Sequence, residues 1–281
     1  MRTRSAFDWV SLAASHAVLL VCTAVFVLPI AFMVVASFKP DDLVLREAGS
    51  WRALFPTEMS FQNYFNVFDR VNFGRFFVNS VLITGSIVVG GLLVNSMAAY
   101  AFSRMRWRGR DFCFGLVLAL LILPFEAIAV PLFYQMIEFG WRNSYRVQIV
   151  PFIANAFSIY LFYSFFLQIP KEMEEAAAMD GAGAWRTFFT LIIPLAKPAF
   201  ATVAILTFLM HWGNYLWPLM VVDHETYRPL PVAIAEFQTL PPIQWGDIMA
   251  FGVMMILPVL AVFLIFQKGF VRGVASSGIK S

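Results

Sequence analysis

The chain has 281 residues, of which 60% are hydrophobic and only 13% are charged, and its formal net charge is +3. A soluble domain of this length carries about a quarter charged residues, so the composition excludes an ordinary soluble fold and indicates a polytopic membrane protein. The two cysteines, Cys22 and Cys113, lie in or beside apolar stretches. They therefore predict neither a disulfide framework nor a metal cluster.

Six apolar segments are long enough to cross a hydrocarbon core of about 30 Å, which takes roughly 20 residues of helix. They lie at residues 14–36, 77–101, 112–137, 147–167, 199–222 and 248–266. Backbone polar groups in lipid must be satisfied within the segment, and the alternation that a barrel needs is absent, so we expect helices. The first segment is too long for the core of a signal peptide and is predicted to be retained. We predict an all-α membrane protein with six transmembrane helices in a single domain, residues 1–281.

The basic residues predict the orientation of the chain. The densest cluster, Arg104–Arg110, falls in the shortest inner loop if the N-terminus is inside, and short loops count most in the positive-inside rule. Both termini and the polar segment 169–198 are then cytoplasmic. The long loop from Phe38 to Arg75 then faces outward. It is expected to lie on the membrane surface, to dock an external partner, or to do both.

The polar segment 169–198 has the sequence of a short helix, a turn and a second helix. Lys171–Met179 contains strong helix formers after Pro170, with acidic residues near its start. Gly181 is predicted to end this helix, because glycine takes the left-handed conformation at little cost. A second helical stretch is predicted from Ala184 toward Ile193, ending at Pro194.

The same segment offers negative charge to a partner. Its acidic side chains, which would match a basic groove, are Glu172, Glu174, Glu175 and Asp180. An ordinary solvated loop is the alternative, because helices rich in Ala and Glu are common.

Motifs in this segment carry a resemblance to a known family. Glu175-Ala-Ala-x-x-x-Gly181, followed by Ile192-Ile-Pro194, resembles the EAA loop of ATP-binding-cassette (ABC) importer permeases, whose usual ending is Ile-x-Leu-Pro. Asp180-Gly181-Ala182 is similar to the carbohydrate branch of that family. Further similar stretches are Ser37–Lys39, Asn79-Ser80, Ala98–Arg104, Pro131–Phe133, Gly140–Tyr145 and a tail at Phe266–Gly273 like that of MalG-type subunits.

The resemblance implies a type I ABC importer permease fold, in which residues 169–198 form a cytoplasmic coupling helix that docks on an ATPase. The residues it assigns to coupling are Glu175, Ala176, Ala177, Asp180 and Gly181. It also implies a second homologous permease as heterodimer partner, two copies of a cytoplasmic ABC ATPase and an extracytoplasmic solute-binding protein. The expected location is a bacterial or archaeal cytoplasmic membrane, with lipid but no nucleic acid as a further partner. The tail from Phe270 is expected to reach the ATPase.

The chain itself is not expected to be an enzyme. None of its five lysines lies in a G-x-x-x-x-G-K-[ST] phosphate loop, so ATP and Mg²⁺ would be bound by the partner ATPase and this chain would hold no cofactor. No H-E-x-x-H motif and no nucleophile–base pair at a telling spacing is present, and we predict no catalytic and no metal-binding residues.

Polar side chains at membrane depth are functional candidates because they are costly there. Glu126 and His211 are two such residues, and His211 opens the stretch His211–Pro218, whose aromatic rings and amide suit the faces and hydroxyls of a sugar. The family usually reads Trp-Asn-x-Phe-x-x-Pro here, but this chain has Gly213 in place of that Asn. The candidate substrate pathway comprises Glu126, His211, Trp212, Asn214, Tyr215 and Trp217, with simple helix packing as the alternative reading.

The alternative function is a proton-coupled secondary transporter that uses Glu126 and His211 as a proton relay. Six spans are few for that class, and no inverted repeat with broken helices is evident. The polar segment 169–198 would also have no purpose there, so we expect an importer permease for a sugar or sugar-like solute.

Overall fold

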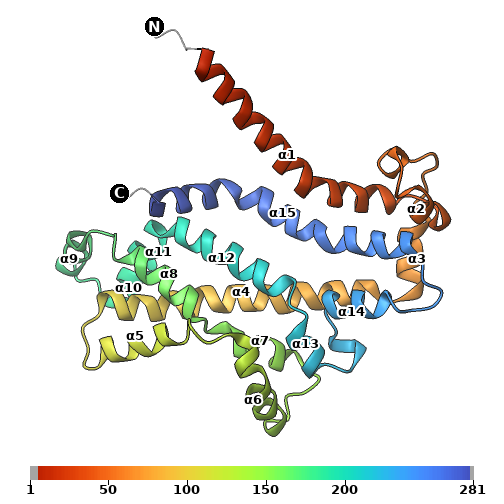
Figure 1. The fold of residues 1–281 in the computed structure, drawn as a ribbon. Helices are drawn as coiled ribbons and strands as arrows, with labels where there is room; N and C mark the ends of the chain where they lie inside the picture. Colours follow the sequence, from red (N-terminus) through yellow and green to blue (C-terminus); the bar gives the residue numbers. More distant parts are fainter. Residues whose placement is uncertain (1–5, 279–281) are drawn as a thin grey trace. The chain divides into compact units, whose positions relative to one another are not determined.

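The computed structural model describes residues 6–278, and the side chains of residues 12 and 14–266. Every regular element in that part of the chain is a helix, so the predicted all-α class is confirmed (Figure 1). The α-helices are α1 (Ala6–Ala36), α2 (Asp41–Glu47), α3 (Gln62–Arg70), α4 (Phe73–Arg104), α5 (Arg110–Ala119), α6 (Phe125–Glu138), α7 (Tyr145–Ile153), α8 (Ala156–Phe166), α9 (Lys171–Met179), α10 (Ala184–Thr187), α11 (Ile193–Leu195), α12 (Lys197–Trp212), α13 (Leu216–Val221), α14 (Leu230–Phe237) and α15 (Trp245–Gly278). Shorter helical turns are η1 (Trp51–Ala53), η2 (Phe188–Ile192) and η3 (Glu225–Tyr227).

The chain divides into two compact units. The first unit comprises Met1–Phe73 and Ile234–Ile256, and the second comprises Gly74–Ala233 and Leu257–Ser281. The predicted coupling segment and the candidate substrate residues all belong to the second unit.

Four stretches of helix are long and apolar enough to span a membrane: Ala14–Ala36, Phe73–Arg104, Tyr145–Phe166 and Trp245–Phe266. Ala184–Leu195 and Lys197–Trp212 meet at a bend of 79° and give a fifth if they count as one span. Among the described residues the count is therefore four or five. The predicted six spans and the single domain stay predictions.

Three of the six predicted spans are broken inside. Residues 112–137 form α5 and α6, separated before Pro124, whose missing N–H and restricted predecessor interrupt a helix. Residues 199–222 form α12 and α13, separated at Gly213–Tyr215. Residues 147–167 form α7 and α8, where the side chain of Asn155 caps α8 by accepting from the N–H of Ser158 at 2.9 Å.

Asn95 of α4 holds the break between α7 and α8 together. Its Nδ2 donates to the carbonyl of Ile153 at 3.0 Å, and its Oδ1 accepts from the N–H of Asn155 at 2.8 Å. Asn95 is buried, so these two bonds replace the helical bonds that the break removes. Gly91, one turn earlier, allows the close approach, because a Cβ there would lie 3.3 Å from the Ile153 carbonyl oxygen.

In the first unit, Ser37 and Lys39 of the Ser37–Lys39 motif are buried and make polar contacts with several parts of the loop after α1. The Nζ of Lys39 donates to the carbonyl of Arg52 at 2.7 Å and lies 3.0 Å from Glu47 Oε2. Asn63 of α3 donates to the carbonyls of Ser37 and Lys39, both at 2.8 Å. The motif therefore fixes the fold of this loop through its main-chain carbonyls and one buried ion pair.

The ion pair gives a pH-dependent prediction. The hydrogen bond from Lys39 lowers the pKa of Glu47 below its ordinary value of 4.5, against the opposing effect of burial, and Thr57 lowers it further. A carboxyl with a lowered folded-state pKa stabilises the fold above its unfolded pKa and loses that contribution as the pH falls through the folded value. We expect Glu47→Gln to lower the thermal unfolding midpoint at pH 7, and the difference from wild type to shrink steadily below pH 4.5.

Thermal unfolding of the detergent-purified protein between pH 7 and pH 3 measures this difference. Glu58→Gln is the matched control, because Glu58 is an exposed acid in the same loop, and we expect no change from it. A deficit for Glu47→Gln that stays constant across this range would contradict the role of the Glu47 charge.

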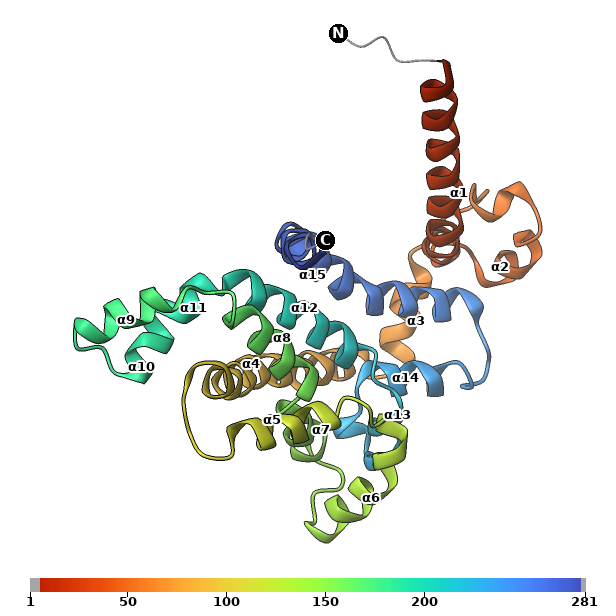
Figure 2. The same ribbon diagram turned by 60° about the vertical axis from the view of Figure 1, so that its left-hand side comes forward.

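In the second unit, two clusters of buried residues organise the helices. One joins the last turns of α4 to α8 and to the segment leading into α12, through Tyr100, Phe162, Phe166, Phe188 and Ile192. The other joins α6, α7 and α13 around Trp217. Within the first cluster, α8 packs against α12, and it also packs against α5. The segment 169–198 contributes Phe188 and Ile192 to the first cluster, and its helix α9 lies at the outer end of the loop (Figure 2).

The motifs Asn79-Ser80 and Gly140–Tyr145 meet at the loop around η3. Asn79 Nδ2 donates to the carbonyls of Thr226 and Arg228 at 3.0 and 2.9 Å, and its Oδ1 accepts from the Tyr145 hydroxyl at 2.7 Å. Asn143 accepts from the N–H of Asp223 at 2.6 Å. These side chains supply the hydrogen bonds that irregular backbone lacks.

Candidate functional site: the EAA loop and the 211–218 stretch

The EAA loop, residues 169–198, begins with α9 and turns sharply after it. Gly181 has φ +78°, the left-handed conformation that its sequence position predicts. The N–H of Ala182 donates to the carbonyl of Ala177 at 2.9 Å, and that of Gly181 to Ala178 at 3.0 Å. This pair of bonds is a Schellman motif, which satisfies the last carbonyls of the helix and fixes the direction of the turn.

The return leg of the loop differs from the prediction. Helix does not stop at Pro194 but continues through α10, η2 and α11 to Leu195, where Ala196 breaks it before α12. Pro194 lies in the first turn of α11, where a missing N–H is tolerated. The five residues of η2, Phe188–Ile192, form a π-helix, a rare wider turn found mostly as a single turn within α-helices.

The residues assigned to coupling lie on the outside of the loop. Glu175, Ala176, Asp180 and Gly181 are exposed, and Ala177 is half-buried. The side chains of Met179 and Trp185 are 89% and 65% exposed beside them. Sequence reasoning did not single out these two apolar residues, although large apolar side chains in an otherwise polar loop were a readable signal.

Glu174 behaves differently from its neighbour Glu175. It was grouped with the acids that face a partner, but its carboxylate points inward and lies 3.0 Å from Nη1 of Arg104, at the end of α4. Its side chain is 18% exposed and that of Arg104 is 4% exposed. The prediction for Glu174 was wrong because Arg104 lies close enough to pair with it, on the side of α9 that points about 100° away from Glu175.

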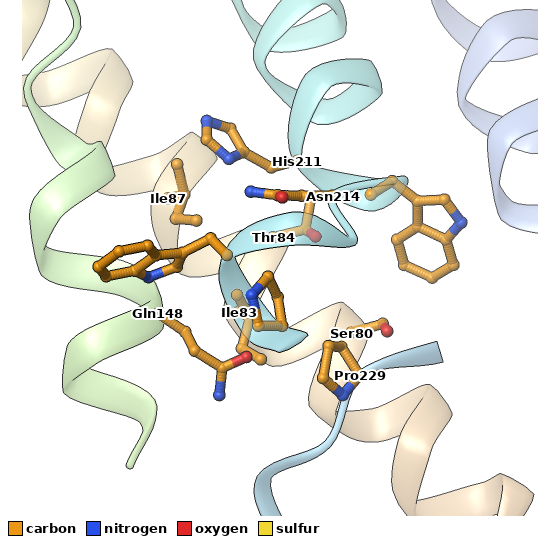
Figure 3. Close-up of a pocket in the computed structure, with 11 residues that line it drawn as sticks. Ser80, Ile83, Thr84, Ile87, Gln148, His211, Asn214 and Pro229 are labelled. Carbon is orange, nitrogen blue, oxygen red and sulfur yellow. The ribbon is translucent and has the colours of Figure 1, made fainter. Parts of the chain in front are cut away.

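The stretch 211–218 lines a small cavity together with α4 and α7. His211, Trp212, Asn214 and Trp217 contribute to its wall, and Figure 3 shows Asn214 and Gln148 on opposite sides of the space. Its volume of about 10 Å³ has room for about one water molecule. The cavity is polar on several sides but is far too small for a sugar ring in this conformation.

Among the six predicted pathway residues, the two tryptophans are packed in the protein interior, and two others lie away from the cavity. Trp217 is fully buried, and its Nε1 donates to the carbonyl of Val147 at 2.8 Å. Trp212 is also buried, with its ring 6.2 Å from that of Phe77. Tyr215 and Glu126 are exposed and do not line the cavity. The structure thus brings together four of the six predicted residues.

A family model described as "Binding-protein-dependent transport system inner membrane component" matches residues 87–276, which include the whole EAA loop and the 211–218 stretch. The chain belongs to this family. It is a multi-pass membrane permease subunit that works with a binding protein, and it is not itself an enzyme.

Individual relatives agree with the family match. The permease is 34% identical to the arabinooligosaccharides transport system permease protein AraQ of Halalkalibacterium halodurans, over 90% of this chain and 91% of the relative. It is 32% identical to the trehalose/maltose transport system permease protein MalG of Thermococcus litoralis, over 90% and 91%. Its fold matches a bacterial ABC transporter for import of the polysaccharide alginate, with TM-score 0.85 and 26% identity over 95% of this chain and 99% of that one.

Membership in this family removes the support for a proton-coupled transporter. The structure adds a physical reason, because Glu126 is exposed in the first turn of α6 and does not share the cavity of His211.

Gln148 of α7 is a residue of the permease that sequence reasoning missed. It is buried, and its Nε2 donates to the carbonyls of Ser144 and Tyr227 at 3.3 and 3.0 Å. Gln148 lines the cavity, and its Oε1 has no hydrogen-bond partner among the described residues. An amide at the start of an apolar span was the available signal, since such groups are costly in lipid.

Proposed function

We propose that the chain is a permease subunit of an ATP-driven ABC importer for a sugar or sugar-like solute. The observation that carries the proposal is the EAA loop, in which α9 and its Gly181 turn present Glu175 and Asp180 to the outside. A short helix held on a packed platform suits docking in the cleft of an ATPase. The names of the relatives, which concern arabinooligosaccharides, trehalose/maltose and alginate, support a carbohydrate substrate.

The proposed assembly contains a second, homologous permease, two copies of a cytoplasmic ATPase and an extracytoplasmic binding protein. ATP and Mg²⁺ are bound by the ATPase, and this chain holds no cofactor. Both termini and the EAA loop are cytoplasmic, in a bacterial or archaeal inner membrane. The large apolar surface of α1 supports partners in the bilayer, because none of its most apolar window is buried within the chain.

In this assembly the solute path lies at the interface of the two permeases. The stretch 211–218 of this chain contributes aromatic and amide groups to that path. Residues Glu175, Ala176, Ala177, Asp180 and Gly181 contact the ATPase and transmit its closure.

ATP hydrolysis by the purified, reconstituted complex tests this function, with and without binding protein and a panel of sugars. We expect one loaded binding protein to stimulate hydrolysis and Glu175→Lys to abolish that stimulation, because it reverses the charge offered to the ATPase. Glu138→Lys, which changes an exposed acid of α6 outside the loop, is the control and should keep it. A complex that copurifies with no ATPase, yet moves solute under a proton gradient, would contradict the proposal.

A further inference from the structure

Arg104 connects three elements of the second unit through a single side chain. It ends α4, and its Nη1 lies 3.0 Å from the Glu174 carboxylate of α9. Its Nη2 donates to the carbonyl of Ile169 at 2.5 Å and to that of Phe166, where α8 ends and the EAA loop begins. A planar guanidinium suits this arrangement, because its rigid fork serves several acceptors in fixed directions.

The attachment matters because α9 has few other contacts with the rest of the unit. None of its residues is buried, so no apolar side chain anchors it in the core. Its side-chain contacts with α4 converge on Glu174, which pairs with Arg104 and also accepts from the Tyr100 hydroxyl at 3.4 Å. A helix held in this way takes its position from one polar cluster.

The same turn of α4 also holds the return leg of the loop. The ring of Tyr100 packs against that of Phe188 in η2, with centroids 5.2 Å apart. Both legs of the EAA loop therefore meet the end of α4, one through an ion pair and the other through an aromatic contact.

We propose that the Arg104–Glu174 pair is a rigid tie that transmits displacement of α9 to α4 and to the end of α8. Arg104 and Glu174 are positioning residues, and they act through the exposed docking face that Glu175 occupies. This inference rests on the proposed function, since it concerns how the EAA loop moves the membrane helices. Glu175 contacts the partner, and Glu174 contacts the rest of the permease. Docking and the transmission of movement therefore depend on two different residues that are adjacent in the sequence.

The tie predicts a separation of ATP hydrolysis from transport. In Glu174→Ala the docking face stays intact, so the ATPase stays bound and continues to hydrolyse ATP. Solute moved per ATP falls about tenfold, the size of effect expected when a coupling contact is lost. Glu174→Gln, which keeps one acceptor oxygen but loses the charge, should fall between Glu174→Ala and wild type.

The experiment measures three quantities on the whole reconstituted complex: ATPase content, ATP hydrolysis and solute uptake into liposomes. Lys171→Ala is the matched control, because Lys171 lies in the same helix with an exposed side chain that has no assigned contact with the partner, and it should keep the wild-type ratio. Arg104→Lys, which keeps the charge but not the fork, should lower the ratio with ATPase content unchanged.

Two results overturn the tie while the proposed function stands. One is a wild-type ratio of uptake to hydrolysis in Glu174→Ala. The other is a parallel loss of ATPase, hydrolysis and uptake, which would make Glu174 a structural support of the docking helix. A wild-type complex that contains no ATPase would overturn the proposed function and the tie together.

Discussion

Replacing Gly181 by valine is expected to abolish solute uptake while the permease still reaches the membrane. Gly181 has φ +78°, where a side chain costs about 1–2 kcal/mol, and a β-branched one fits worst. No atom lies within 4 Å of the position of a Cβ, so the effect comes from the backbone and not from a clash. Relief of the strain breaks the Schellman bonds of Ala182 and Gly181 and re-aims the loop, so α9 no longer fits its partner.

Uptake of labelled solute by cells, with the amount of permease in the membrane fraction, measures this effect. Gly183→Ala is the control two residues away. Gly183 has φ −75° and ψ 167°, which any residue adopts, and its Cβ position is also open. Normal uptake by Gly181→Val would show that the direction of this turn does not matter for coupling.

Replacing Asn95 by leucine is expected to cause the largest loss of stability in the second unit. It leaves the carbonyl of Ile153 and the N–H of Asn155 without partners at a break inside an apolar span. Each unsatisfied buried group costs about 1–3 kcal/mol, and no water in the hydrocarbon replaces the lost bonds. We expect the thermal unfolding midpoint in detergent to fall by about 5 °C or more.

Ser96→Ala provides the comparison for this variant. Ser96 is buried next to Asn95, but its hydroxyl donates only to the carbonyl of Leu93 in its own helix at 3.1 Å. Its removal leaves no hydrogen-bonding group of another helix without a partner, so we expect the free energy of unfolding to change by no more than about 0.5 kcal/mol. Equal midpoints for the Asn95 variant and wild type would mean that the broken span needs no support from α4.

The sequence was sufficient for features that depend on local chemistry. Gly181 was readable as a helix terminator because only its own backbone and its neighbours decide that conformation. The charge and helix propensity of Lys171–Met179 likewise predicted α9 at its observed bounds. The membrane class followed from composition, and the all-α class followed from the length of the apolar segments and their lack of alternation.

Features that depend on contacts between residues far apart in the chain could not be predicted from the sequence. The role of Glu174 depends on where the end of α4 lies, 70 residues earlier at Arg104, which the sequence placed only in a basic cluster. The break at Asn155 is stable only because Asn95 completes its hydrogen bonds, and no local signal shows that pairing. Trp217 looked like a sugar-binding ring, but its N–H serves the carbonyl of Val147 in a buried core.

The π-helical turn Phe188–Ile192 determines the angular phase between the loop and the membrane helix that follows it. Each residue of an α-helix advances the chain by about 100° and 1.5 Å. Because a π turn takes up one extra residue within an α-helix, a deletion of one residue that restored the α-helical turn would keep this phase, whereas a one-residue deletion that left the π turn in place would rotate α10 by about 100° relative to α11. The direction of the loop therefore depends on the number of residues in this leg, and an insertion or deletion that the π turn does not absorb would misdirect it.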